Sequence, residues 1–348
     1  MSLMDRLKKT SSIDIASVLA DSDVFENNQV VHTEIPILNM ALSGTLRGGL
    51  TSGVTQIAGP SKHFKTGLAL MLIRSFLKQY ADGVVLFYDA EFGTPQSYFK
   101  TFNIDTSKVF HTPITDVEQL KHDIMIQLAE FKRGDHVLIV LDSLGQLASL
   151  KEVDDAIEGK QVADMSRAKQ LKSLFRMVTP HLRIKDIPFV VVNHTYKTIE
   201  MYSKDVPGGG TGAYYAADTL LIVGRQQEKV DKDVAGFNFI LNAEKSRFVK
   251  EKSKFTISVR FEGGIEPYSG LLESAIEGGF VEKPSPGWYC KVDPTTKGRS
   301  GKFREADTKT ETFWGDILEN EAFHEYMAKK FGLAFGDILA SDEPTPAP

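Results

Sequence analysis

Short, continuous apolar runs alternate with amphipathic stretches through most of this chain. The apolar runs predict strands of a parallel sheet that is covered on both faces. They lie at residues 54–58, 84–88, 136–141, 189–192 and 219–223. Between two of them, residues 164–184 place apolar side chains three and four positions apart, which predicts an amphipathic helix. Alternating patterns at 236–243 and 254–261 predict two further strands.

This alternation predicts an α/β core with a mostly parallel central sheet over residues 31–264. After residue 264 the pattern changes, and residues 265–340 predict a small C-terminal α+β domain. Its expected elements are a helix within 268–280, a hairpin from 287–292 and 301–304, and a helix over 312–331. The acidic, proline-rich residues 341–348 predict a disordered tail.

Residues 1–30 form a separate N-terminal segment. It holds a short amphipathic stretch, and the polar residues 26–29 divide it from the core. Two interpretations stay open, a flexible terminus and an oligomerisation arm that docks on another subunit.

The most informative motif is the loop between the apolar run 54–58 and the helical pattern 68–77. A strand, a loop ending in Lys-Thr and then a helix predict a phosphate-binding P-loop, whose backbone N–H groups point at a polyphosphate. In this motif Lys65 reaches the β- and γ-phosphates, and the Thr66 hydroxyl holds Mg²⁺. The expected nucleotide-binding residues are Gly59, Pro60, Ser61, Lys62, His63, Phe64, Lys65, Thr66 and Gly67.

One position departs from the P-loop pattern. Phe64 stands directly before Lys65, where the pattern has glycine. Glycine tolerates a positive φ and lets the backbone approach phosphate closely. Phe64 supplies the same N–H group only if its backbone adopts an allowed conformation there.

Two of the predicted strands run directly into carboxylates. Residues 84–88 are followed by Asp89 and Glu91, and residues 136–141 by Asp142. Ligands of such sheets bind at the carboxyl ends of the strands. Asp142 is therefore the second expected Mg²⁺ anchor, and Glu91 the candidate general base. The alternative is that these acids only cap the helices that follow.

Three further segments are candidates for chemistry. A stretch of about 25 residues before position 219 has no apolar period, and its glycines, tyrosines and lysines suit nucleic-acid contact or form a plain surface loop. The mixed-charge residues 151–160 predict a solvated loop. A basic turn carries Lys245 and Arg247, which are either solvated or, in an assembling ATPase, reach a neighbour's phosphates.

Composition adds few constraints. The chain of 348 residues is 42% hydrophobic and 25% charged, as an ordinary globular protein is, and its net charge of −5 neither supports nor rejects nucleic-acid binding. The single Cys290 excludes an intrachain disulfide and a multi-cysteine metal site. No apolar run has the roughly 18 residues of a membrane span, and no secretory signal is present, so a cytoplasmic protein without membrane contact is expected.

The order and spacing of these motifs resemble the RecA/RadA recombinase family, and within it the T4-type phage branch. The resemblance covers residues 31–315. It rests on the segments 59–66, 88–91, 141–144, 192–194, 208–212, 244–247, 262–265 and 287–289. Phe64 departs from the broad family but is similar to the phage branch.

The resemblance implies a RecA-like core that binds ATP and Mg²⁺ and assigns roles by position. Lys65, Thr66 and Asp142 would bind phosphates and metal, Glu91 would position the attacking water, and Tyr98 would stack on adenine. His194 stands where many relatives have glutamine and would sense the γ-phosphate; the alternative is a plain core histidine. Lys245 and Arg247 would reach the ATP of the adjacent subunit.

The resemblance also places two DNA-binding loops at residues 151–165 and 195–213. The expected DNA-binding residues are Lys160, Arg167, Lys197, Tyr202, Lys204, Gly208, Gly209, Gly210, Thr211 and Gly212. The implied function is an ATPase that forms helical filaments on single-stranded DNA and exchanges strands with a homologous duplex. A single-strand-binding protein and a recombination mediator are the implied partners.

Two other functions remain as alternatives. One is a hexameric helicase-type motor on the same core, which would share the P-loop and the basic turn. The other is a nucleotide-binding mediator that assembles on DNA without turnover, and the presence of both Glu91 and Asp142 argues against it.

Overall fold

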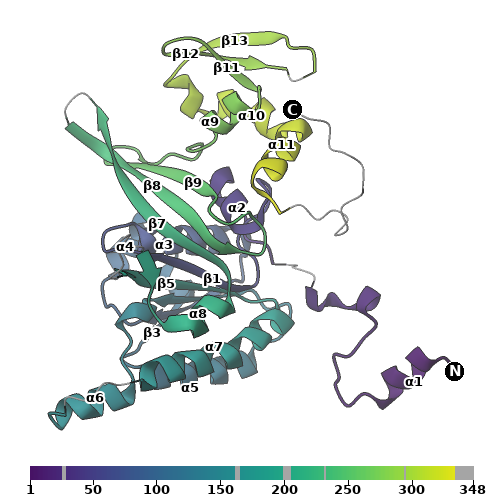
Figure 1. Ribbon diagram of the computed structural model, residues 1–348, viewed down its shortest axis with the longest axis vertical. Helices are drawn as coiled ribbons and strands as arrows, with labels where there is room; N and C mark the ends of the chain where they lie inside the picture. The colour runs from purple at the N-terminus through teal and green to yellow at the C-terminus, as the bar shows by residue number, and fades with distance from the viewer. Residues whose placement is uncertain (26–28, 161–164, 199–204, 231–232, 294, 334–348) are drawn as a thin grey trace.

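The computed structural model describes residues 1–25, 29–160, 165–198, 205–230, 233–293 and 295–333. The predicted tail at 341–348 and the candidates Tyr202 and Lys204 lie outside these ranges. The predicted fold class is confirmed, because a large, mostly parallel sheet with helices forms the body and a small antiparallel sheet lies in the C-terminal part (Figure 1).

The large sheet has the strand order β10-β9-β8-β7-β1-β5-β4-β2-β3. From β7 to β3 all neighbouring strands are parallel, whereas β8, β9 and β10 add an antiparallel edge. The parallel strands are β1 (Gly53–Gly59), β2 (Val84–Asp89), β3 (Val109–Pro113), β4 (Val137–Asp142), β5 (Pro188–Lys197) and β7 (Ala217–Val230). The antiparallel strands are β8 (Asp233–Ser246), β9 (Lys254–Arg260) and β10 (Gly264–Ile265).

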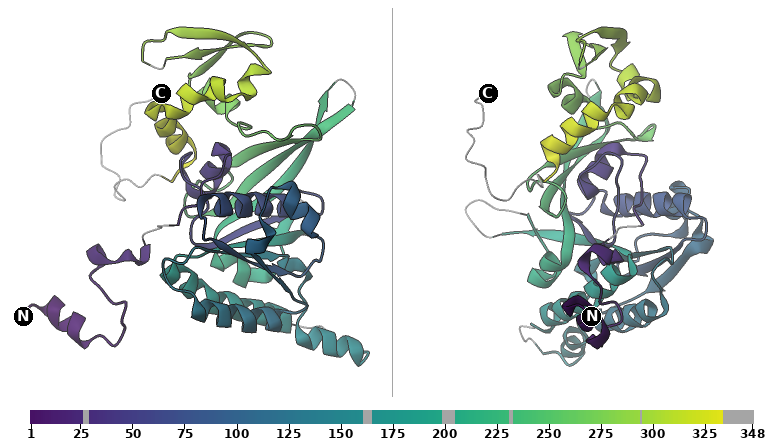
Figure 2. Two further views of the ribbon diagram at one scale, coloured as in Figure 1. Left: turned by 180° about the vertical axis from the view of Figure 1, so that it is seen from behind. Right: turned by 90° about the vertical axis from the view of Figure 1, so that its right-hand side faces the viewer.

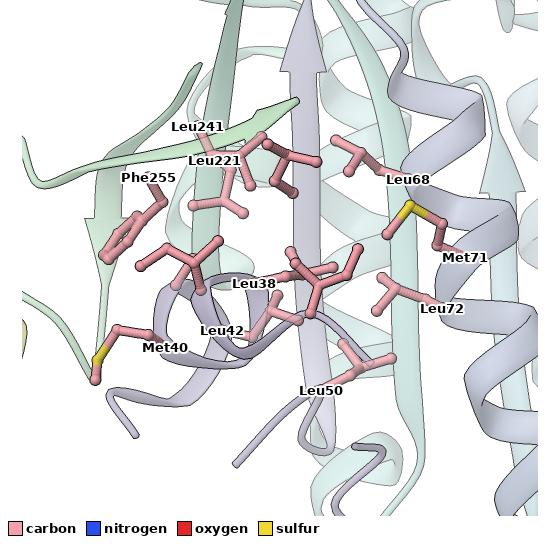
Figure 3. Packing of buried hydrophobic residues seen from close by; sticks show 14 of the residues in the cluster. Leu38, Met40, Leu42, Leu50, Leu68, Met71, Leu72, Leu221, Leu241 and Phe255 are labelled. Carbon is pink, nitrogen blue, oxygen red and sulfur yellow. The ribbon is translucent and has the colours of Figure 1, made fainter. Parts of the chain in front are cut away.

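Helices cover both faces of the sheet, which explains why the strand sequences are continuously apolar. On one face, α2 (Pro36–Ser43) and α3 (Lys65–Gln79) bury side chains such as Leu38 and Leu68 against the sheet (Figure 3). Ile57 of β1 belongs to the same cluster. On the other face, α5 (Val117–Glu130) and α7 (Ser166–Lys185) cover side chains such as Val54. Successive residues of each strand thus bury in two different clusters.

The structure corrects the prediction of a solvated loop at 151–160, because residues Leu150–Ile157 form helix α6. The Ser149 hydroxyl caps this helix by accepting the Glu152 N–H at 3.1 Å. No residue of α6 is buried, and its apolar Leu150, Val153 and Ile157 are exposed among charged residues.

The long segment before β7 is also more regular than predicted. Strand β5 continues to Lys197 and pairs with β6 (Asp205–Pro207), and the glycine run opens helix α8 (Gly210–Ala216). Gly209 precedes that helix with φ 88°, a conformation that favours glycine. The glycines therefore start a helix in addition to forming a loop.

The C-terminal part differs from the prediction in detail. The predicted first helix is shorter, α9 (Leu272–Glu277), and the hairpin of β12 (Trp288–Val292) and β13 (Arg299–Arg304) gains an unpredicted third strand, β11 (Val281–Ser285). The predicted last helix is two helices, α10 (Glu311–Glu319) and α11 (Glu321–Phe331). Asn320 separates them, and its side chain accepts the Ala322 N–H at 2.9 Å as the cap of α11.

The remaining elements are short. They are α1 (Leu3–Thr10), η1 (Leu19–Asp21), η2 (Asp23–Phe25), α4 (Gln96–Thr101), η3 (Thr106–Lys108), η4 (Leu144–Gln146) and η5 (Asp307–Lys309). Helix α1 stands away from the body (Figure 2). The apolar side chains of its segment are exposed. The structure does not test the predicted domain boundaries, which stay a prediction. Within the described ranges, every helix is too short or too polar to span a lipid bilayer.

A buried carboxylate joins three parts of the core. Asp218, at the start of β7, is only 3% exposed. It accepts a hydrogen bond from the Val54 N–H at 3.0 Å. It also forms ion pairs with Arg183 and Arg247, both at 2.7 Å. Strand β1, helix α7 and the end of β8 are thereby tied to one side chain.

Asp218→Ala should lower the free energy of unfolding by about 3 kcal/mol, because it leaves the half-buried Arg183 guanidinium without its counter-charge. Urea denaturation followed by circular dichroism measures this change. Glu273→Ala, which removes an exposed acid, is the control and should cost less than about 0.5 kcal/mol. Equal effects of the two substitutions would contradict a stabilising role of Asp218.

Candidate nucleotide-binding site

The site forms where the parallel strands end. The register pairs Gly59 of β1 with His194 of β5, and Asp89 of β2 with Asp142 of β4. A cavity of about 380 Å³ opens at this edge. Its lining consists of Ser61, Lys62, His63, Phe64, Lys65, Thr66, Gly67, Glu91, Gly93, Thr94, Tyr98, Asp142 and His194.

The loop between β1 and α3 forms one wall of this cavity. Helix α3 begins at Lys65, so the N–H groups of its first turn have no partner within the helix and are available to an anion. The Lys65 amine is buried and donates to the Pro60 carbonyl at 2.9 Å. Burial lowers the pKa of Lys65, and the nearby Glu91 and Asp142 carboxylates oppose that shift. A bound polyphosphate would add further negative charge beside the amine and so favour its protonated form.

The structure answers the question that Phe64 raised. Its backbone adopts φ 58° and ψ 20°, the left-handed conformation that glycine adopts most easily. Phe64 therefore adopts an allowed backbone conformation, so its N–H group is retained in the loop as that of glycine would be. Its side chain is only partly exposed.

Asp142 and Thr66 meet at the floor of the cavity. The Thr66 hydroxyl donates to Asp142 Oδ2 at 2.8 Å, and the Thr94 hydroxyl lies 3.5 Å from the same oxygen. Burial raises the pKa of Asp142 to about 6, with the Thr66 hydrogen bond opposing the shift and the Glu91 and Asp89 charges adding to it.

These oxygens fit a divalent cation. Asp142 Oδ1 is buried and has no hydrogen-bond partner. A carboxylate and a hydroxyl beside a phosphate site are donors that Mg²⁺ accepts. A cation here would also stabilise the charged form of Asp142, which burial disfavours.

Glu91 and His194 face each other across the cavity. Glu91 follows β2, and its N–H donates to the Asp142 carbonyl at 3.2 Å. Glu91 Oε2 lies 3.5 Å from His194 Nε2, which is buried and makes no hydrogen bond. A Cβ atom on Gly145 would lie 2.7 Å from the His194 ring. Any larger residue at position 145 would therefore displace this ring.

Sequence reasoning missed the role of Asp89 as a support for Glu91. Asp89 Oδ1 accepts the N–H groups of Glu91 at 3.2 Å and Phe92 at 2.7 Å. Its other oxygen lies 3.1 Å from His111 Nε2. An aspartate two residues before a turn residue is a typical Asx-turn signal, so the sequence did contain a local indication. His111 approaches only through the pairing of β2 with β3.

Tyr98 is the residue to which the resemblance assigns stacking on adenine, and that role stays a prediction. It belongs to α4, lines the same cavity and contacts Phe102 edge-on with ring centroids 5.5 Å apart. Burial raises the pKa of Tyr98, so the ring carries no charge at neutral pH.

Two predicted residues are not part of this cavity. Lys245 donates to the carbonyl oxygens of Tyr214 at 3.0 Å and Tyr215 at 2.9 Å, at the end of α8, while Arg247 pairs with Asp218. Burial and the adjacent Arg247 charge lower the pKa of Lys245. Neither side chain contacts the nucleotide cavity of its own protomer.

The predicted glycine-rich DNA segment is attached directly to the site. The Gly208 N–H donates to the His194 carbonyl at 2.9 Å, and the Gly208 carbonyl accepts from Asn193 at 2.7 Å. Gly209 and Gly210 both have positive φ angles, and Thr211 is exposed. A Cβ atom on Gly212 would lie 2.7 Å from the backbone of helix α7.

The other predicted DNA residues differ in their surroundings. Lys197 is exposed at the end of β5, and Lys160 pairs with Glu158. Arg167 instead donates to the carbonyl oxygens of Leu144 and Gly145, next to the nucleotide cavity. The structure does not test DNA binding by these residues, which stays a prediction.

An α/β sheet with a lysine-containing loop and a carboxylate at the ends of its parallel strands is the architecture of a P-loop nucleotide-binding protein. The RecA N-terminal domain model matches residues 6–266, and the model described as "Bacteriophage T4, Recombination and repair protein, C-terminal domain" matches residues 268–327. The chain belongs to the RecA family of recombinases.

Curated relatives agree with this assignment. The chain is 47% identical to the recombination and repair protein of Enterobacteria phage T4, over 95% of this chain and 86% of that protein. It is 26% identical to protein RecA of Mycobacteroides abscessus, over 90% of this chain and 88% of that protein. Protein RecA of Thermus aquaticus is also 26% identical, over 70% of each chain.

Asp142→Asn should weaken the dependence of nucleotide binding on Mg²⁺, because an amide oxygen is a poorer ligand for a hard cation than a carboxylate. Affinity for ATP in Mg²⁺ should fall about 10- to 100-fold, the range for disturbed metal sites. Titration with a fluorescent ATP analogue in Mg²⁺ and in EDTA measures both values. If the ratio of the two affinities were unchanged, Asp142 would have no part in metal binding.

Proposed function

We propose that this chain is a DNA-dependent ATPase that forms helical filaments on single-stranded DNA and exchanges strands with a homologous duplex. Its role would be homologous recombination, repair and recombination-dependent replication in the cytoplasm, for a phage protein that of the host cell. The observation that carries the proposal is the single cavity in which Lys65, the Thr66–Asp142 pair and Glu91 meet, in a chain of the RecA family.

The chemistry assigns a task to each residue. Lys65 and the N–H groups of the first turn of α3 hold the phosphates of ATP, and Thr66 and Asp142 hold Mg²⁺, which stabilises developing negative charge. Glu91 orients a water molecule and accepts its proton. Tyr98 lies against the base. Asp89 keeps the Glu91 turn in place through its two backbone hydrogen bonds.

The link to DNA runs through His194. Its side chain faces Glu91, and its carbonyl accepts the N–H of Gly208 at the start of the glycine run. A displacement of His194 would therefore be transmitted to Gly208, in the segment 195–213. We expect this segment to contact DNA together with the segment 151–165. Such coupling is reciprocal, so DNA should favour ATP binding by the same factor.

Assembly completes the site in this proposal. Lys245 and Arg247 reach the ATP of the adjacent protomer, which fits their absence from the cavity of their own protomer. The arm at residues 1–30 docks on a neighbour, and the exposed Leu3, Leu7, Ile13 and Ile15 supply the apolar surface for that contact. A single-strand-binding protein and a recombination mediator are the further partners that we propose.

Strand exchange tests the proposal against the two alternatives. The protein with ATP and Mg²⁺ should form joint molecules between circular single-stranded DNA and a homologous linear duplex. Directional unwinding of a forked duplex without joint molecules would support a motor instead. DNA binding without any ATP turnover would support a mediator.

Glu91→Gln should slow ATP hydrolysis at least 100-fold while ATP and DNA affinities stay within about threefold, because the amide cannot accept the proton of water. Single-turnover hydrolysis and a fluorescent-ATP titration measure the two effects. Glu325→Gln, an exposed acid of α11 outside the cavity, is the matched control. Normal hydrolysis by Glu91→Gln would remove this residue from the role of base.

A mixing experiment tests the role of Lys245 in the neighbouring site. Lys245→Ala and Glu91→Gln proteins should each turn over ATP slowly on DNA. In an equal mixture, about a quarter of the interfaces would combine an intact Glu91 with an intact Lys245, since head-to-tail contacts join different surfaces. Recovery of activity to that level is expected; a mixture no more active than its components would contradict action between subunits.

A further inference from the structure

The backbone of Phe64 adopts a conformation that does not suit a bulky residue. Its φ of 58° is left-handed, a region in which a Cβ atom meets the following carbonyl. P-loops have glycine at this position, which avoids that strain. Contacts elsewhere must therefore hold Phe64 in place.

The ring of Phe64 supplies such contacts. It stacks on Phe239 of β8, with ring centroids 5.0 Å apart and planes inclined by 19°, and it lies 6.5 Å from the ring of Phe102. The side chain packs against the main hydrophobic cluster. Phe64 thus anchors the loop to a strand that lies far away in the sequence.

The Phe64 ring lies directly against Gly67, in the space that a side chain at position 67 would fill. A Cβ atom built on Gly67 would come within 2.4 Å of the Phe64 ring, closer than real contacts allow. Gly67 lies in helix α3 and does not have a positive φ angle, so its backbone does not require glycine. Alanine is the better residue in a helix when nothing obstructs it. The Phe64 ring is therefore the reason for glycine at position 67.

A second contact joins the same loop to the same pair of strands. Arg225 of β7 donates to the Lys62 carbonyl at 3.1 Å. Arg225 and Phe239 are register partners in the β7–β8 pair. The Lys62–Phe64 turn is therefore attached to one point of the β7–β8 pair by two contacts. Arg225 binds the Lys62 carbonyl, and Phe239 stacks on the Phe64 ring.

We propose that Phe64 and Gly67 are an interdependent pair that positions the phosphate-binding loop. The Phe64 ring, seated over Gly67 and against Phe239, keeps the loop in its phosphate-binding conformation before ATP arrives. This inference rests on the proposed function, because it takes the cavity to be an ATP site. A loop ordered in advance loses less conformational freedom on binding, so the pair strengthens nucleotide affinity.

A double-mutant cycle on the full-length protein tests this pairing. Gly67→Ala should weaken ATP binding in Mg²⁺ at least tenfold, since its methyl group displaces the ring. Phe64→Gly removes the ring and should weaken binding about three- to tenfold through the loss of its anchor. The double variant, Phe64→Gly with Gly67→Ala, should bind ATP more tightly than Gly67→Ala alone. Titration calorimetry gives the affinities, and Tm values report on the folded state.

Phe239→Ala supplies the matched comparison for the anchor. It should weaken ATP binding when Phe64 is present and have less than a twofold effect in the Phe64→Gly protein. Phe255→Ala removes a buried ring of β9 that pairs with Phe331, and it should lower Tm and leave the affinity for ATP within twofold. An equal loss of affinity for the two alanine variants would overturn the anchor.

The remaining outcomes are also decisive. If Gly67→Ala does not fold but the double variant folds and binds ATP, the pairing is supported. If Gly67→Ala is equally harmful with and without Phe64, or has no effect at all, the pairing is wrong although the ATP site stands. If the wild-type protein does not bind ATP, the proposed function itself fails and this inference with it.

Discussion

The alignment of strand ends at one edge of the sheet is the constraint on which the site depends. The parallel register places Gly59 beside His194 and Asp89 beside Asp142. A shift of one residue would turn every side chain of a strand to the opposite face. Such a shift would force the buried side chains of both clusters to repack, and the observed register brings the polar residues at the strand ends together in one cavity.

The same edge connects chemistry to the surfaces that we expect to bind DNA and neighbours. The carbonyl of His194 holds the glycine run, while Lys245 holds the opposite end of α8 through the Tyr214 and Tyr215 carbonyls. Helix α8 is thus bound at its start through His194, a residue of the cavity, and at its end by Lys245, a proposed contact to the next protomer. In our proposal, a motion of Lys245 toward a neighbour breaks its two hydrogen bonds to α8, which would couple assembly to the expected DNA-binding segment.

Sequence patterns predicted the parts that depend on local signals. The buried strands, the Lys65–Thr66 loop and the carboxylates at the ends of β2 and β4 follow from periodicity and motif. Helix α6 was missed although Leu150, Val153 and Ile157 have helical spacing, because the prediction rested on the mixed charge of the segment, and none of these side chains is buried. The contacts of Phe64 with Phe239 and of Asp89 with His111 arise only from the folded sheet, and no local signal encodes them.

The most direct test of this account is the rate of ATP hydrolysis in Mg²⁺ with and without long single-stranded DNA. His194 joins the cavity to the glycine run, and in our proposal the cations of a neighbour complete the site. DNA should therefore raise turnover at least tenfold, with a steep dependence on protein concentration. An equal rate in the presence and absence of DNA would contradict the coupling between the site and the DNA-binding segments.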